Sequence, residues 1–330
     1  MVEVKGAARE LTSAARGLDA GLGAAVETLT REAGALDLGG RRWYRLIGDV
    51  NEASRRAGLP YYVDPTVNLF QTPDGFRRHF FAHSYRIEKV RRFLVGGREM
   101  ATLQVRQLGH RRDGHQLLGF SRDLQPFALV VLDELEPFAE QTRERGSATP
   151  PRCTEKREAD PGEALAKCGE LLGQAVAAAG GPERLLVALT ESTERHELQH
   201  QVDGPHLEMA RLVLKRLAAY AEEPQRRVNR ELSAYIAEMT APGSAPRLSL
   251  AHLARFALLG SRGTEHHVGV LAMEALSGRE TRGPGGVDRA ALGQALGDLA
   301  AESDDALRAR AAKAWKDLFG QALPEANPLE

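Results

Sequence analysis

The residues best suited to chemistry in this 330-residue sequence lie in the segment 193–204, TERHELQHQVDG. His196 and His200 are four positions apart, a spacing that places both imidazoles on one face of a helix, where they can hold one divalent metal. Glu197 follows the first histidine directly, so its carboxylate can reach a water at the metal without being a ligand itself. This pattern predicts metal-assisted hydrolysis.

The segment 196–202, HELQHQV, resembles the active-site helix of the zincin metallopeptidases, and is especially similar to that of their thermolysin-like, gluzincin branch. Most of the chain lies outside this resemblance. The resemblance implies a bound Zn²⁺, a peptide or protein substrate, and Glu197 as the general base that takes a proton from water and delivers it to the leaving amine. It also implies an edge strand beside the active-site helix that binds an extended peptide.

A catalytic zinc needs a third protein ligand, with water in the fourth position. The resemblance points to Glu231 in the segment 229–235, NRELSAY, because gluzincins take this ligand from a glutamate on a later helix, often with small residues near it. Ser233 and Ala234 are such small residues. The family often has an acidic residue after the glutamate, but this chain has Tyr235 there, so other residues must orient the histidines. Asp203 is one candidate for that role.

Two other residues are alternatives to Glu231 as the third ligand. His206 stands at the last histidine of the pattern HExxHxxGxxH, which is similar to the metzincins, although Asp203 replaces the glycine and Pro205 suggests that a new helix begins there. Glu238, two turns beyond Glu231 on the same helix face, is the poorer alternative. We predict Glu231.

An anionic tetrahedral intermediate also needs a hydrogen-bond donor opposite the metal. Tyr235, His266 and His267 are candidates by residue type and position. Together with Glu197, we predict Tyr235 and His267 as catalytic residues.

The hydrophobic and charged fractions, 42% and 27%, are ordinary for a globular protein, and the net charge of −1 gives no bias toward nucleic acid. Long uncharged apolar runs are absent, which predicts no membrane span. The first residues do not resemble a secretory signal, which predicts a cytoplasmic location for the chain as given, although an exported mature form stays open. The sequence does not predict the oligomeric state.

The hydrophobic periodicity predicts an α+β fold. We expect an N-terminal α+β lobe at 1–145 with an antiparallel or mixed sheet, a linker at 146–162, and an all-helical, zincin-like metal-binding lobe at 163–330. Strands are expected at 61–63, 80–95, 100–108 and 127–132, with a hairpin turn at Gly96-Gly97. Helices are expected at 7–35, 43–53, 164–179, 182–202, 206–221, 225–239, 249–259, 265–276, 288–300 and 304–319.

The segment 77–115 is rich in arginine and histidine. We interpret it as the solvated face of strands rather than a nucleic-acid surface, because the chain as a whole is neutral and contains no recognisable binding module. His79 and His83 fall in an expected strand, where a spacing of four does not bring side chains together as it does on a helix. We therefore expect structural roles for them.

Cys153 and Cys168 could form one local disulfide if the protein is exported. In the cytoplasm they would be reduced, and we expect reduced, inert thiols.

The leading hypothesis is therefore a zinc metallopeptidase of gluzincin type. One alternative is a catalytically silent, zincin-like binding or structural protein. Another is that the HExxH sequence is accidental and lies on the surface of a helical interaction protein. Leu198 and Val202 argue against an accidental motif, because they give the histidine helix an apolar stripe, as a buried helix would have.

Overall fold

The computed structural model describes residues 2–33, 40–72, 75–109, 117–122, 125–155, 162–204, 207–241, 245–259, 263–283 and 286–329. It contains 63% helix and 18% strand, so the expected α+β class is confirmed. By their internal contacts, residues divide into one compact unit of Met1–Lys89 with Gln104–Gln116 and another of Val90–Leu103 with Leu117–Glu330. The boundaries predicted at 145 and 162 stay a prediction.

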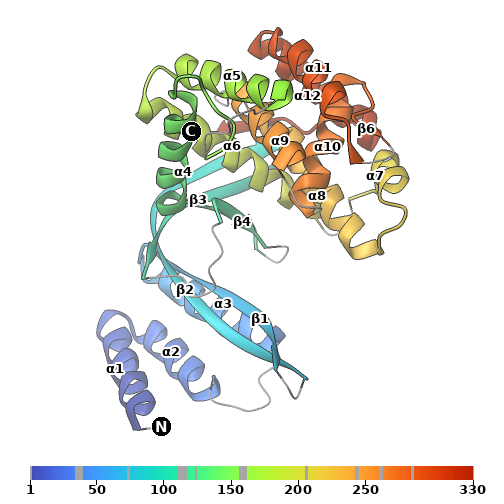
Figure 1. Ribbon diagram of the computed structural model, residues 1–330. Helices are drawn as coiled ribbons and strands as arrows, with labels where there is room; N and C mark the ends of the chain where they lie inside the picture. The colour runs from blue at the N-terminus through green and yellow to red at the C-terminus, as the bar shows by residue number, and fades with distance from the viewer. Residues whose placement is uncertain are drawn as a thin grey trace. The chain divides into compact units, whose positions relative to one another are not determined.

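The first unit packs helices against a long antiparallel hairpin (Figure 1). Its helices are α1 (Val2–Leu18), α2 (Ala20–Glu32) and α3 (Gly40–Arg56), and its hairpin joins β1 (Tyr61–Thr72) to the part of β2 (Gly75–Val95) that ends at Lys89. Trp43 and Ile47 of α3 are buried, and their apolar cluster includes Val63 and Phe80 of the hairpin. The amphipathic pattern of α3 is thereby explained, because its apolar face covers the strands.

The strands follow the hydrogen-bonded order β1-β2-β3-β5-β4, and β8 (Ala326–Leu329) pairs with β2. Gly96 and Gly97 have φ of 55° and 81° and connect β2 to β3 (Arg98–Leu108), which confirms the expected hairpin turn. The fifth strand, β5 (Phe127–Val131), pairs antiparallel with β4 (Gly119–Ser121). Strand β4 was not predicted from the sequence, because a strand of three residues is too short to show alternation.

Helices make up most of the second unit and gather around one apolar core (Figure 1). Their bounds are α4 (Leu132–Gly146), α5 (Gly162–Ala179), α6 (Pro182–Asp203), α7 (Arg211–Arg216), α8 (Glu222–Glu238), α9 (Pro246–Leu259), α10 (Thr264–Ser277), α11 (Arg289–Ala300) and α12 (Asp304–Phe319). The core includes fully buried leucines from α6, α8, α9 and α11. Burial of this apolar surface is the main force that positions these helices.

Two expectations for this part of the chain are wrong, and one helix was not expected. The helix expected at 206–221 is the shorter α7, and α4 was not expected at all. The region 163–330 is not all helical, since it contains β6 (Arg282–Gly283), β7 (Gly286–Val287) and β8. Strand β8 is explained by its partner, because a short C-terminal segment can complete its backbone hydrogen bonds on β2.

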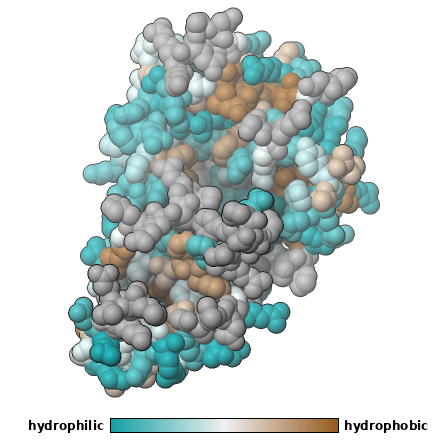
Figure 2. Space-filling model, turned by 60° about the horizontal axis from the view of Figure 1, so that its bottom comes forward, coloured by the Kyte–Doolittle hydropathy of each residue, from teal (hydrophilic) through white to brown (hydrophobic). Residues whose placement is uncertain are grey.

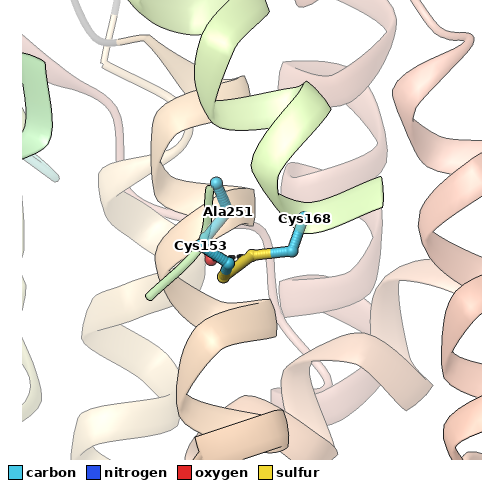
Figure 3. The surroundings of a disulfide bond; sticks show 3 residues. All are labelled: Cys153, Cys168 and Ala251. Carbon is cyan, nitrogen blue, oxygen red and sulfur yellow. Dashed lines mark hydrogen bonds between the residues drawn. A yellow bond between two sulfur atoms is a disulfide. The ribbon is translucent and has the colours of Figure 1, made fainter. Parts of the chain in front are cut away.

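The expectation of reduced cysteines is also wrong. Cys153 and Cys168 form a disulfide with a Cα–Cα distance of 5.5 Å (Figure 3). The bond ties the segment after α4 to α5, and Cys168 Sγ lies 3.5 Å from the carbonyl oxygen of Ala251 on α9. Three parts of the chain are therefore joined at this point.

None of the helices in the described ranges is both long and apolar enough to cross a membrane. On the face drawn in Figure 2, hydrophilic residues cover much of the visible surface and hydrophobic ones form separate patches.

Candidate metal centre

Helix α6 carries the histidine pair and is anchored to strands by its apolar side. Leu198 is fully buried in a cluster with Phe93, Val95 and Met100. Because Leu198 lies between the two histidines in the sequence, its burial fixes how the helix is turned about its axis. The apolar stripe expected on this helix is confirmed.

Two buried charged residues of α6 form hydrogen bonds with segments that are distant along the chain. Glu194 is 2% exposed and accepts hydrogen bonds from Thr102, at 2.8 Å, and from Arg91. Arg195 is also buried and donates to the carbonyl oxygen of Pro324 at 2.9 Å. Burial lowers the pKa of Arg195 to about 10, so it remains a cation at neutral pH. Neither Glu194 nor Arg195 was predicted to anchor the helix, because their partners are distant along the chain.

The predicted ligand atoms of His196, His200 and Glu231 form a compact triangle. The two Nε2 atoms are 3.1 Å apart, and the Glu231 oxygens lie 3.5 Å from Nε2 of His196 and 3.6 Å from Nε2 of His200. Zinc bonds of about 2.0–2.1 Å in a tetrahedron put neighbouring ligand atoms about 3.3 Å apart. The triangle therefore fits one small divalent metal, and these three residues form such a group in the described part of the chain.

Without a metal, the two glutamates beside His196 favour its protonated form. Burial opposes a charge on the ring, but the carboxylates of Glu231 and Glu238 outweigh it and raise the pKa of His196 well above its usual value. Burial works against the charge of Glu231 as well, yet the hydrogen bonds from His196 and His200 lower the pKa of this glutamate. The site thus stabilises positive charge between its ligands, as a metal site must.

Glu238 contacts the ring nitrogen of His196 that does not face the ligand triangle. Its Oε2 lies 3.2 Å from Nδ1 of His196, opposite the Nε2 that faces the ligand triangle. Glu238 is therefore an orienting residue in this structure rather than the third ligand. It occupies the role for which Asp203 was considered, whereas Asp203 accepts a hydrogen bond from Gln199 at 2.6 Å.

Glu197 is buried against strand β4. A Cβ added to Gly119 would lie 2.8 Å from Glu197 Cγ and 2.8 Å from the carbonyl oxygen of Leu129, so a side chain at this strand position would collide with both. Burial raises the pKa of Glu197, while the neighbouring histidines His196 and His200 counteract that shift. A carboxylate with a raised pKa is well suited to accept a proton and release it.

Tyr235 lies one turn after Glu231 on α8, and its ring is edge-on to His196 with 4.5 Å between ring centroids. Burial and the nearby carboxylates, Glu231 and Glu238 foremost, raise its pKa well above the ordinary value. The phenol therefore keeps its proton and can donate a hydrogen bond beside the ligands. Tyr235 was a candidate donor by residue type and position in the sequence, and its catalytic role stays a prediction.

Two other candidates are His267, which the structure describes, and His206, which it does not. The ring of His267 lies near the rings of Tyr220 and His266, at centroid distances of 5.1 and 5.6 Å. Its predicted catalytic role stays a prediction. His206 lies outside the described residues.

In the arginine-rich segment, His79 and His83 stack on either side of Phe81, each with 6.3 Å between ring centroids. His83 is buried and His79 is exposed. The stack gives both rings packing partners on one face of β2, as expected for structural residues. His110 and His115, with Arg111 and Arg112, fall outside the described ranges.

Comparison with known proteins gives no relative: no protein-family model, curated protein or solved structure matches this chain. The site must therefore be judged by its own geometry.

Proposed function

We propose that the protein is a zinc-dependent metallopeptidase of gluzincin type, which hydrolyses peptide or protein substrates. The observation that carries the proposal is the triangle of His196, His200 and Glu231 with Glu197 next to it on a buried helix. Two imidazoles and one carboxylate are the donor set of many catalytic zinc sites, although the same atoms could hold another divalent metal.

A divalent metal held by these three residues would supply Lewis acidity, which polarises a substrate carbonyl and activates water. Glu197 then takes the proton from the attacking water and returns it to the leaving amine. Tyr235 donates a hydrogen bond to the oxyanion, which its neutral phenol permits. Glu238 keeps the His196 ring oriented through Nδ1.

Strand β4 supports an extended peptide as the substrate. It ends the hydrogen-bonded strand order, so one of its backbone edges is not paired with another strand of that order. Its Gly119 packs on Glu197, which brings this edge next to the proposed general base. A substrate that adds as a further strand there would place a peptide bond beside the catalytic residues.

The alternative, a silent zincin-like binding protein, makes a different prediction for Glu197→Gln. Under our proposal this variant binds zinc like the wild type but hydrolyses a casein or mixed-peptide substrate at least about a hundredfold more slowly, because proton transfer is lost. Glu223→Gln, an exposed glutamate on α8, is the control and should keep full activity. Zinc binding by the wild type with no hydrolysis that depends on Glu197 would favour the silent alternative.

For the place of action, we infer an oxidising compartment rather than the cytoplasm. The Cys153–Cys168 disulfide carries this inference, since such bonds persist mainly outside reducing compartments. Thiol labelling of denatured protein taken directly from its native host would test it: free thiols at both positions would contradict it.

A further inference from the structure

A cluster of basic residues lies away from the metal centre, where α4, the segment after it and α9 meet. Arg145 in the last turn of α4 is only 4% exposed, and its carbonyl oxygen accepts a hydrogen bond from the amide of Arg152 at 3.1 Å. Arg255 and His252 belong to α9. The charge of Arg255 lowers the pKa of Arg145, and the charge of Arg145 lowers the pKa of His252. None of these four residues is one of the proposed metal ligands.

The backbone around the disulfide fixes this arrangement. Cys153 follows Arg152 directly, and its partner Cys168 lies against the carbonyl of Ala251, the residue before His252 (Figure 3). A Cβ added to Gly169 would lie 2.5 Å from the carbonyl oxygen of Pro151, so this segment is pressed onto α5. The backbone that carries the cluster is therefore held in place by a cross-link and by close packing on α5.

The cluster has too little negative charge within the described residues. Its acidic neighbour is Glu155, which is 70% exposed and meets Arg255 at 3.5 Å, the limit of a hydrogen bond. Arg145 donates only to neutral acceptors, the carbonyl oxygen of Gln141 and the hydroxyl of Thr142. The C-terminus of α4 compensates part of the Arg145 charge, but it does not account for the other two guanidinium groups.

Buried side-chain nitrogens in this cluster also lack partners. Nε of Arg152, Nε of Arg255 and Nε2 of His252 are each buried without a hydrogen bond. Burial together with Arg255 lowers the pKa of Arg145 to about 10, and burial together with Arg145 and Arg255 lowers that of His252 to about 3. Unpaired buried donors in a positive field are the features that an anion would satisfy.

We propose that Arg145, Arg152 and Arg255, with His252 beside them, form a binding site for a divalent oxyanion of the phosphate or sulfate type. Guanidinium groups suit this ligand because their N–H pairs match two oxygens of a tetrahedral anion. The side chain of Arg255 is partly exposed and that of Glu155 is exposed, so the anion would enter beside them and replace Glu155 as the partner of Arg255.

Isothermal titration of the full chain with inorganic phosphate, at constant ionic strength set by chloride, tests this proposal. We expect saturable binding that weakens at least about tenfold in Arg255→Gln and in Arg152→Gln, because each loses a charge-assisted hydrogen bond. Glu155→Gln removes the competing carboxylate and should bind phosphate more tightly. Arg143→Gln is the matched control, because Arg143 is a neighbouring α4 arginine paired with Glu140, and it should leave binding unchanged.

A parallel titration with methyl phosphate tests the source of the anion. If the natural ligand is a phosphate group carried by a larger molecule, the monoester must bind as well, whereas a site for the free ion does not require this. Circular dichroism of each variant shows whether it is folded. The absence of saturable phosphate binding to the folded wild type, or equal binding by Arg255→Gln, Arg152→Gln and the control, would overturn the proposal.

Discussion

Removal of the Glu238 carboxylate should weaken metal binding although Glu238 is not a ligand. Its Oε2 lies 3.2 Å from Nδ1 of His196, and the side chain is almost fully buried. Glu238→Gln keeps the size and an acceptor but loses the charge, which costs about 1 kcal/mol and hence about fivefold in affinity. Glu238→Leu removes the acceptor and leaves Nδ1 unpaired, and loss of such an orienting partner costs about 10- to 100-fold.

The assay is competition for Zn²⁺ between the folded protein and a chromophoric chelator. Glu223→Leu, an exposed change on the same helix, controls for nonspecific effects of the substitution. The expected order of affinity is wild type equal to the control, then Glu238→Gln, then Glu238→Leu. A Glu238→Leu variant that folds and binds zinc as tightly as the wild type would refute the orienting role.

Three further predictions concern the stability of the fold, and the first of them also concerns hydrolysis. Gly119→Ala should destabilise the fold by about 1–3 kcal/mol and impair hydrolysis, since the new Cβ would lie 2.8 Å from Glu197; urea unfolding and activity unchanged from wild type would contradict the packing. His252 has its pKa lowered to about 3 by burial and nearby arginines, so its stabilising effect is complete above about pH 6.5 and decreases as pH falls toward 3. The loss from pH 7 to pH 5 should therefore be about 2 kcal/mol smaller in His252→Gln, and equal losses in the two proteins would be inconsistent with this reasoning. Cys153→Ser with Cys168→Ser should lower the free energy of unfolding by about 3 kcal/mol, as expected for a 15-residue separation, and an unaltered urea midpoint would count against the cross-link.

The parts of the site that could be predicted from the sequence are those set by helical geometry or implied by the resemblance to the gluzincins. The spacing of His196 and His200 fixes their common face, and Glu231 and Tyr235 follow one another at one turn on α8. The structure brings Glu231 to the histidine pair, as expected. Helical periodicity gives the common face of the histidines, whereas the choice of Glu231 as their partner came from the resemblance to the gluzincins.

The contacts between distant segments could not be predicted in the same way. Glu238 was considered only as a poorer ligand, since nothing in its spacing shows that it reaches Nδ1 instead of the metal. The approach of Gly119 to Glu197 depends on a strand too short to be recognised. The disulfide was not expected because cysteine pairing depends on the compartment as well as on distance.

The central claim is that His196, His200 and Glu231 hold one zinc ion, and metal analysis of purified protein tests it most directly. Zinc should be measured after limited dialysis for the wild type, Glu231→Ala, His206→Ala and the exposed control Glu223→Ala. We predict one zinc per chain in the wild type, in His206→Ala and in the control, and less than about a tenth of that in Glu231→Ala, because two histidines alone do not retain a catalytic zinc. A wild type without zinc, or a Glu231→Ala variant that keeps it while His206→Ala loses it, would contradict the account.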